Sequence, residues 1–258
     1  MSTLRLCIAG ATGWTGSALV DAVVAAEDLE LRSAVSRSAA GGELGGAPVH
    51  ASVGEALAGV DVLVDYTAHD VVKANTLTAL ERGVAVVIGT SGLTADDFAE
   101  IEAAAGEVGV IAAGNFSLTA AMMKAAARLA ARHLPCWEVI DYASATKADA
   151  PSGTARELAE ALGAAKVDHA VADTAGAVEA RGATIAGTQV HSLRLPSFTV
   201  STEVVFGLPD ERLSIRHDAG TSAAPYVAGT LLAARVAPRT KGLVRGLDTL
   251  LLKYPAGA

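Results

Sequence analysis

Three glycines near the N-terminus have a spacing that suits the binding of a dinucleotide. The segment Gly10-Ala11-Thr12-Gly13-Trp14-Thr15-Gly16 has the pattern G-x-x-G-x-x-G and lies between a β-rich run and a helical stretch. Missing side chains let the backbone turn tightly against a pyrophosphate, and the N–H groups that begin a helix attract its phosphates. We therefore expect all seven residues to contact a dinucleotide; the alternative is a tight turn with a structural role only.

The residues after the second expected strand bear on which dinucleotide is bound. An acidic residue there would accept a hydrogen bond from the ribose 2′-hydroxyl of NAD, but the sequence has Val35-Ser36-Arg37-Ser38. An arginine and serines suit the 2′-phosphate of NADPH better. We expect Arg37 to contact this phosphate, with NADPH preferred and NADH still possible; the alternative is a solvated loop arginine.

Two further loops follow expected strands. They are Asp65-Tyr66-Thr67 and Gly89-Thr90-Ser91-Gly92. Ligands of open α/β sheets bind at the carboxyl ends of the strands, so Thr67, Gly89, Thr90 and Ser91 are candidate cofactor contacts. The second loop is also acceptable as an ordinary turn.

Apolar strands alternate with helices in the first half of the chain. The expected strands are Leu4–Ala9, Leu29–Ser36, Val60–Asp65, Val84–Ile88 and Val108–Ala112, and the expected helices are Gly16–Ala26, Val71–Arg82 and Thr94–Ala105. This alternation predicts a parallel, doubly wound sheet of the Rossmann type.

The pattern changes after Asn115 and becomes richer in strands. We expect helices at Thr119–His133, Ser152–Leu162 (ended by Gly163) and Pro225–Val236, and strands at Glu138–Ala143, Val190–Leu195, Thr199–Phe206 and Arg212–His217. Turns containing Pro196 and Pro209 join the last three strands, which favours antiparallel hairpins. The fold class is thus α/β, with a second, smaller α+β domain.

The segment Lys147-Ala148-Asp149-Ala150-Pro151-Ser152-Gly153-Thr154-Ala155 identifies a family. It closely resembles the K-x-D-A-P-S-G-T-A signature of 4-hydroxy-tetrahydrodipicolinate reductases. The glycine turn, the two loops above, Gly114-Asn115-Phe116-Ser117, His191–Pro196 and Ile215–Asp218 resemble that family in the same order. The resemblance covers nearly the whole chain.

The resemblance implies roles and domain limits. Residues 1–116 with 222–258 would form the dinucleotide-binding Rossmann domain, and residues 117–221 a mixed-sheet domain for substrate binding and oligomerisation into a homotetramer. Nucleotide contacts would extend to Ala113, Gly114, Asn115 and Phe116. Lys147 would be the proton donor, and Gly153 and Thr154 would bind a substrate carboxylate. Ser152 can cap a helix whose first N–H groups then face that anion; the alternative is an ordinary capped helix.

The sequence departs from the family in its substrate half. The family has H-H-x-x-K, but here Ala143 and Ser144 replace the two histidines, and neither can act as an imidazole acid. A histidine expected near Ser201 and an arginine near Ser222 are also absent. Tyr142 is a weak alternative proton donor, although a core or interface role is more common for such a tyrosine.

Three hypotheses follow. The first is reduction of a cyclic imine, or conjugated C=N bond, other than the dipicolinate precursor; the second is the lysine and diaminopimelate pathway reaction with a modified site. The third is a non-catalytic NADPH sensor, against which the retained Lys147 and Pro151–Thr154 argue.

Composition excludes several other classes. The 258 residues carry a net charge of −8, which disfavours nucleic acid as a partner. No apolar stretch reaches the ~18 residues of a membrane span, and Met1–Gly16 lacks the features of a signal peptide, so we expect a cytoplasmic protein. Cys7 and Cys136 are expected to be buried and unpaired, and no spacing suggests a metal site.

Overall fold

The chain divides into two compact units, which are described separately. The computed structural model describes residues 3–165 and 173–253. The first unit consists of Met1–Leu118 with Ala223–Ala258, and the second of Thr119–Ser222.

A parallel sheet forms the centre of the first unit, as the alternation of strands and helices predicts. Its strand order is β13-β7-β6-β5-β1-β2-β4-β3, and every neighbouring pair is parallel except β3 with β4. The strands are β1 (Leu4–Ala9), β2 (Leu29–Val35), β3 (Glu43–Leu44), β4 (Ala47–His50), β5 (Val62–Asp65), β6 (Ala85–Ile88), β7 (Gly109–Ala112) and β13 (Gly242–Arg245). The strand order reverses direction at β1, between β2 and β5, which is where open α/β sheets bind ligands.

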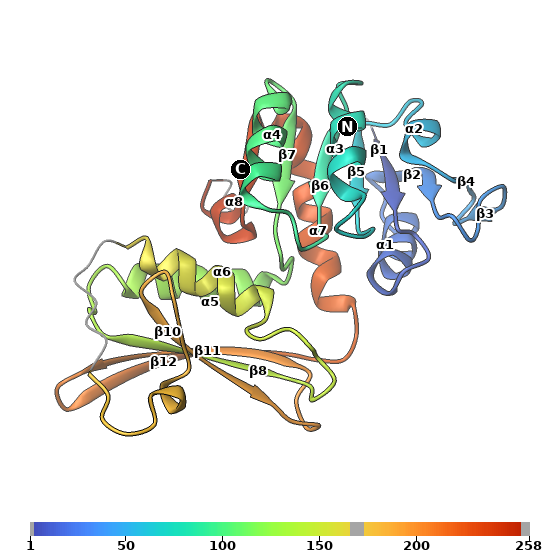
Figure 1. Cartoon of the computed structure of the whole chain (residues 1–258). Coiled ribbons are helices and arrows are strands. Elements are labelled where there is room, and N and C mark those ends of the chain that lie inside the picture. The colour runs from blue at the N-terminus through green and yellow to red at the C-terminus, as the bar shows by residue number, and fades with distance from the viewer. Residues whose placement is uncertain (1–2, 166–172, 254–258) are drawn as a thin grey trace. The chain divides into compact units, whose positions relative to one another are not determined.

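Helices cover both faces of this sheet (Figure 1). They are α1 (Trp14–Val24), α2 (Val53–Ala56), α3 (Val72–Leu80), α4 (Ala95–Ala105), α7 (Ala224–Val236) and α8 (Leu247–Lys253), with a short 3-10 turn, η2, at Ala237–Arg239. Strands β5, β6 and β7 are buried along their whole lengths, as expected for parallel strands covered on both sides.

The second unit contains a mixed sheet, and one expectation about it is wrong. The strand order is β12-β11-β8-β10-β9, formed by β8 (Trp137–Ala143), β9 (Ala183–Ile185), β10 (Thr188–Arg194), β11 (Val200–Leu208) and β12 (Glu211–Ala219). Strands β11 and β12 form the expected hairpin, but β10 and β11 do not pair. Strand β8 lies between them, parallel to β10 and antiparallel to β11.

Burial along β8 explains its central place. Trp137, Val139, Asp141 and Ala143 are buried and alternate with three half-buried residues, so one face of the strand belongs to a core. Helices α5 (Leu118–Ala130) and α6 (Gly153–Gly163) cover that face (Figure 1). Strand β8 thus contributes to this core along its whole length, and it pairs with β10 on one edge and with β11 on the other.

The apolar run in β11 is covered within its own unit. Val204 and Phe206 are fully buried in the core that α6 completes, and only Val205 points to the other face. Alternation along the strand divides this run between the two faces of the sheet.

Smaller differences concern element ends and one cysteine. Helix α1 begins at Trp14 rather than Gly16, and Gly163 is the last residue of α6 rather than its stop. Cys7 is buried as expected, but Cys136 is exposed. The short 3-10 helix η1 (Val178–Arg181) and the elements β3, β4, β9, β13, α2 and α8 were not expected, because they are too short to show a clear period.

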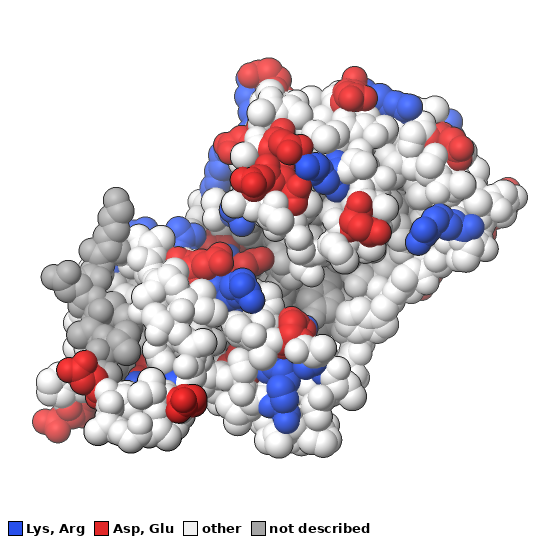
Figure 2. Space-filling view, in the orientation of Figure 1, with Lys and Arg blue, Asp and Glu red and all other residues white. Residues whose placement is uncertain are grey.

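Charges of both signs are interspersed on the face of the molecule that Figure 2 draws. No helix in the described ranges is both long and apolar enough to cross a membrane. Among the same residues, no group of three histidine, cysteine or acidic side chains is placed to hold a metal ion.

The packing of α6 gives a stability prediction. Leu158→Ala removes a fully buried side chain between α6 and the sheet, so we expect the free energy of unfolding of the second unit to fall by about 2–5 kcal/mol. Urea unfolding followed by the fluorescence of buried Trp137 measures it, in a Trp14→Phe background. Leu213→Ala, at a position 44% exposed on β12, is the control and should change little. Equal losses for the two variants would contradict this account of the core.

Candidate active site

The glycine turn after β1 is closed by direct backbone contacts. A Cβ on Gly16 would lie 2.0 Å from the carbonyl oxygen of Gly10, and one on Gly10 would lie 2.4 Å from the carbonyl oxygen of Tyr66. Gly10 also has a positive φ of 80°, which favours glycine. The N–H of Gly13 donates to Gly10 and closes the turn at 2.9 Å. Glycine is therefore required here by close packing of the backbone.

The N-terminus of α1 has the properties of an anion site. Its N-cap is Gly13, with no side-chain capping bond, and no acidic residue lies in the first turn. The first N–H groups of the helix are therefore not blocked by a carboxylate, and a pyrophosphate fits their charge. Trp14, the first residue of the helix, is 59% exposed and packs edge-on against Tyr226 of α7.

Hydroxyl groups gather at the end of β2. The hydroxyl oxygens of Thr12 and Ser36 are 2.8 Å apart, and those of Ser36 and Ser38 are 3.2 Å apart. Arg37 lies between the two serines in sequence and is exposed. It makes no hydrogen bond or ion pair with other residues of the described ranges. The loop thus offers several donors and one unpaired cation.

Asp65, at the end of β5, organises the next loop. Its carboxylate is buried and accepts hydrogen bonds from the N–H of Thr67 and the amide of Asn75, both at 2.8 Å, as well as from the hydroxyl of Thr67. Burial raises the pKa of Asp65, and these hydrogen bonds oppose the shift. The side chain of Thr67 is therefore committed to holding the loop, whereas its backbone remains close to the glycine turn.

Tyr66 occupies the space above Gly89. A Cβ on Gly89 would lie 2.1 Å from the Tyr66 ring, so only glycine fits there. The Tyr66 hydroxyl and that of Thr230 in α7 are 2.6 Å apart, and burial raises the pKa of Tyr66. The neighbouring Thr90 and Ser91 are more exposed than the strand before them. The sequence pattern placed Tyr66 in a loop after an expected strand but indicated no role for it.

The segment that follows β7 packs closely against α7. A Cβ on Gly229 would lie 2.0 Å from the carbonyl oxygen of Phe116, whose ring is buried. The side chain of Asn115 accepts the N–H of Ser117 at 2.8 Å and shapes the turn. Ala113 is buried and Gly114 is exposed, so within this predicted segment Gly114 is the more accessible to a ligand.

In the second unit, Lys147 lies in the loop between β8 and α6. Its ammonium is 2.7 Å from a carboxylate oxygen of Asp149, and its N–H donates to the carbonyl of Ser144 at 3.0 Å. Ser152 caps α6 by accepting the N–H of Ala155 at 3.3 Å, and no acidic residue lies in the first turn. Gly153 is exposed, and a Cβ there would meet nothing within 4 Å, so an anion can approach its backbone. Thr154 follows as the second residue of the helix and is half-buried.

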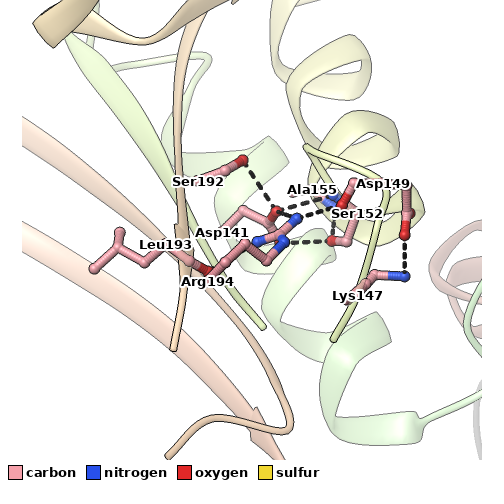
Figure 3. A network of polar contacts seen from close by, with 8 residues as sticks. All are labelled: Asp141, Lys147, Asp149, Ser152, Ala155, Ser192, Leu193 and Arg194. Atoms are coloured by element: carbon pink, nitrogen blue, oxygen red, sulfur yellow. Dashed lines mark hydrogen bonds and ion pairs between the residues drawn. The ribbon is translucent and has the colours of Figure 1, made fainter. Parts of the chain in front are cut away.

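Asp141 and Arg194 hold this loop, although sequence reasoning gave neither a role. Asp141 is fully buried and accepts the N–H and the hydroxyl of Ser152 at 2.9 and 2.6 Å, while Arg194 donates to it at 2.8 Å (Figure 3). The available signal was a carboxylate at a buried position of an alternating strand, because such a charge needs partners.

Tyr142 points to the other face of the sheet from Asp141. Its hydroxyl donates to Glu203 at 3.0 Å, and the guanidinium of Arg216 lies over its ring at 4.6 Å. Burial and the Glu203 carboxylate raise the pKa of Tyr142. The tyrosine is part of an ion-pair cluster formed by Glu203 and Arg216 on that face.

The two positions at which the family resemblance predicts histidines differ in character. Ala143 is fully buried on the helix-covered face, and its carbonyl accepts the N–H of Leu195 at 3.1 Å. The hydroxyl of Ser144 is 3.0 Å from that of Thr146, in the same loop as Lys147. The loop therefore offers a lysine and neutral hydroxyls, without an imidazole.

Known proteins match this chain over almost its whole length. The family described as dihydrodipicolinate reductase, N-terminus, matches residues 4–116, and its C-terminal counterpart matches residues 116–251. The chain belongs to the dihydrodipicolinate reductase family. The resemblance read from the sequence signature is thereby confirmed.

Individual members of this family are similar to the chain over nearly its whole length. The 4-hydroxy-tetrahydrodipicolinate reductase of Moorella thermoacetica is 37% identical, with 97% of this chain and 99% of that protein covered. That of Nocardia farcinica is also 37% identical, over 96% and 99% of the two chains. The solved dipicolinate-bound dihydrodipicolinate reductase of Paenisporosarcina sp. TG-14 has a TM-score of 0.84 at 28% identity, and the match covers 96% of this chain and 100% of that one. An amine dehydrogenase of Mycobacterium smegmatis, at 15% identity and a TM-score of 0.64, shares the fold alone.

The pairing of Lys147 with Asp149 gives a pH prediction for this dihydrodipicolinate reductase family member. The Lys147 ammonium lowers the pKa of Asp149, so in Lys147→Ala we expect that pKa to rise toward the ordinary value of about 3.9. Because the folded-state pKa is the lower one, the pair stabilises the fold at neutral pH, and that stabilisation is lost as pH falls through the acid range. Carboxyl-carbon NMR titration measures it; Lys241→Ala is the control, and an unchanged Asp149 titration in Lys147→Ala would contradict the pairing.

Proposed function

We propose that this protein is an NADPH-dependent reductase that transfers hydride to the carbon of a cyclic C=N bond in a small carboxylate-bearing substrate. The observation that carries the proposal is the Lys147–Asp149 pair beside the capped N-terminus of α6. The first substrate to test is the dipicolinate precursor named in the family's relatives, 4-hydroxy-tetrahydrodipicolinate. Its reduction is a step toward lysine and diaminopimelate.

The residues of the first unit would bind and orient the cofactor, which supplies the hydride. Gly10 and Gly16 allow the tight backbone turn that leads into α1, and the uncapped start of that helix would favour the charge of the pyrophosphate. Thr12, Ser36, Ser38 and Arg37 would surround the 2′-phosphate. The loops at Thr67, Gly89–Ser91 and Ala113–Phe116 would complete the nucleotide site.

The residues of the second unit would hold the substrate and supply a proton. Hydride addition to the imine carbon places an electron pair on nitrogen, which must receive a proton or be protonated beforehand. Lys147 would donate that proton directly or through water, while the N–H groups of Gly153 and Thr154 would bind a substrate carboxylate. The products are the amine and the oxidised cofactor, so electrons and protons balance.

A second candidate is the reduction of a different cyclic imine. Ala143 and Ser144 support it, because a methyl group and a hydroxyl cannot provide the cationic contacts of two imidazoles. A substrate with one carboxylate, or one that arrives already protonated, would need fewer such contacts.

One experiment separates these candidates. NADPH consumption is measured against a panel that contains the dipicolinate precursor, cyclic imines with one carboxylate and an uncharged cyclic imine. Turnover of the precursor supports the family reaction, and preference for a monocarboxylate supports the second candidate. Tight NADPH binding without consumption of any member would overturn the proposal in favour of a nucleotide sensor.

Lys147→Ala tests the proton donor. A general acid contributes about 10²–10⁴ in rate, so we expect kcat on the best substrate to fall by roughly that factor, while the dissociation constant of NADPH stays unchanged. The matched control is Lys241→Ala, which removes an exposed ammonium paired with Glu107 in the first unit. Wild-type kcat in Lys147→Ala would show that another group, or the substrate itself, brings the proton.

Arg37→Ala tests the choice of cofactor. A hydrogen bond to a charged group contributes about 1.5–3 kcal/mol, so the ratio of kcat/KM for NADPH over NADH should fall about 10- to 100-fold. Arg32→Ala, at an exposed position of β2, the strand that precedes Arg37, should leave the ratio unchanged. If both variants keep the wild-type ratio, Arg37 is only a solvated loop arginine.

We also propose a homotetramer built through the second unit. The family resemblance supports it, and so does the face of the mixed sheet that α5 and α6 leave uncovered (Figure 1). That face carries the half-buried Ile140 and Val205 and the exposed Leu193, together with the ion pairs of Glu138 and Glu203. Light scattering at micromolar concentration should report four chains, and a monomer would contradict this proposal.

A further inference from the structure

Arg194 connects two segments of the second unit that lie 45 and 53 residues away in sequence. Its Nη2 donates to a carboxylate oxygen of Asp141 at 2.8 Å and to the carbonyl oxygen of Asp149 at 2.7 Å (Figure 3). Its Nη1 donates to the carbonyl of Leu193 at 2.9 Å, which fixes the guanidinium against its own strand. One nitrogen thus joins β8 to the loop that carries Lys147.

Asp141 connects the same guanidinium to the start of α6. Besides Arg194, this carboxylate accepts the N–H and the hydroxyl of Ser152 and, at 3.2 Å, the hydroxyl of Ser192. Asp141 is fully buried, and the Arg194 side chain is only 17% exposed. Neither charge is stable there without the other, so their relative position is strongly constrained.

The hydrogen bonds from Arg194 to Asp149 and to Asp141 lead, through these residues, to the two groups that the proposed reaction needs. On one side, Asp149 is held by its carbonyl and in turn holds the Lys147 ammonium at 2.7 Å through its carboxylate. On the other side, Asp141 holds Ser152, which caps the helix that begins with Gly153 and Thr154. The proposed proton donor and the proposed carboxylate-binding group are therefore both positioned by one guanidinium, that of Arg194.

We infer that Arg194 is a positioning residue that, through Asp141 and the Asp149 carbonyl, sets the distance between the Lys147 ammonium and the N-terminus of α6. This inference rests on the proposed function for its kinetic consequence. Reactants must be held close to the reactive geometry, and small displacements cost large factors in rate. Release of the Asp149 carbonyl would let the loop move relative to the helix, which weakens substrate binding and proton delivery together.

The central experiment compares two arginines that both pair with carboxylates of β8. Arg194→Gln breaks the bridge to Asp141, and Arg181→Gln breaks the ion pair with Glu138 on the opposite face of the same strand. For Arg194→Gln we expect kcat/KM to fall about 10- to 100-fold, as for the loss of a hydrogen bond to a charged group. The loss should combine a higher KM for the imine substrate with a lower kcat, at an unchanged dissociation constant for NADPH. Arg181→Gln should keep wild-type kinetics.

A purely structural role gives a different kinetic result. If Arg194 only stabilised the fold, its loss would reduce the fraction of active protein, so apparent kcat would fall and KM would stay constant. That result, or equal kinetics for the two glutamine variants, would overturn the inference. A double-mutant cycle with Asp141→Asn gives an independent readout: the double variant should lose little more activity than either single variant, whereas multiplicative losses would show that the residues act separately.

Hydrogen exchange tests the inference without any catalysis. In Arg194→Gln, the amides of residues 147–155 should exchange faster than in wild type and in Arg181→Gln, while those of the first unit stay unchanged. If the wild type reduces no imine but this difference is present, the proposed function fails and the positioning role stands. If the wild type is active and the exchange rates of 147–155 are equal in all three proteins, the positioning role fails and the proposed function stands.

Discussion

The buried carboxylate of Asp141 is the constraint on which the geometry of the second unit depends. A fully buried charge must accept hydrogen bonds from neighbouring donors. Here the donors are Ser152 at the start of α6, and Ser192 and Arg194 of β10. Because these elements are far apart in sequence, satisfying one side chain also fixes the strand order and the start of the helix. The loop with Lys147 takes its position from this arrangement.

The first unit depends on close backbone packing at its glycine turn. Backbone passes so close to backbone at Gly10 and Gly16 that no side chain fits, and the helix that follows begins without a capping side chain. A charged network would be harmful there, since free N–H groups and the positive end of the helix are what attract a phosphate. The glycine turn of the first unit thus depends on the absence of side chains, whereas the loop with Lys147 depends on a buried, fully hydrogen-bonded carboxylate.

Ala143 and Ser144, where the family resemblance predicts two histidines, fit into the framework of the second unit without disturbing it. Ala143 packs in the core as part of the alternation of β8, and Ser144 bonds within the loop. The ion pair of Lys147 with Asp149 and the cap at Ser152 do not involve either residue. The arrangement around the lysine therefore does not depend on the side chains at these two positions.

The sequence by itself determined what depends on local pattern. The glycine turn, the alternation of strands and helices and the nine-residue segment from Lys147 to Ala155 were enough for the fold class and the family. Short strands such as β9 and β13 were not predicted, because a few residues show no clear hydrophobic period.

Only the tertiary structure decided which distant groups meet. It placed β8 between β10 and β11 where a hairpin was expected, turned Tyr142 away from Asp141, and divided Val204 and Val205 between two faces. It also joined Arg194 to Asp141 across 53 residues. Such pairings follow from which face of each strand must be buried and which buried charges must be satisfied, and neither is set by neighbours along the chain.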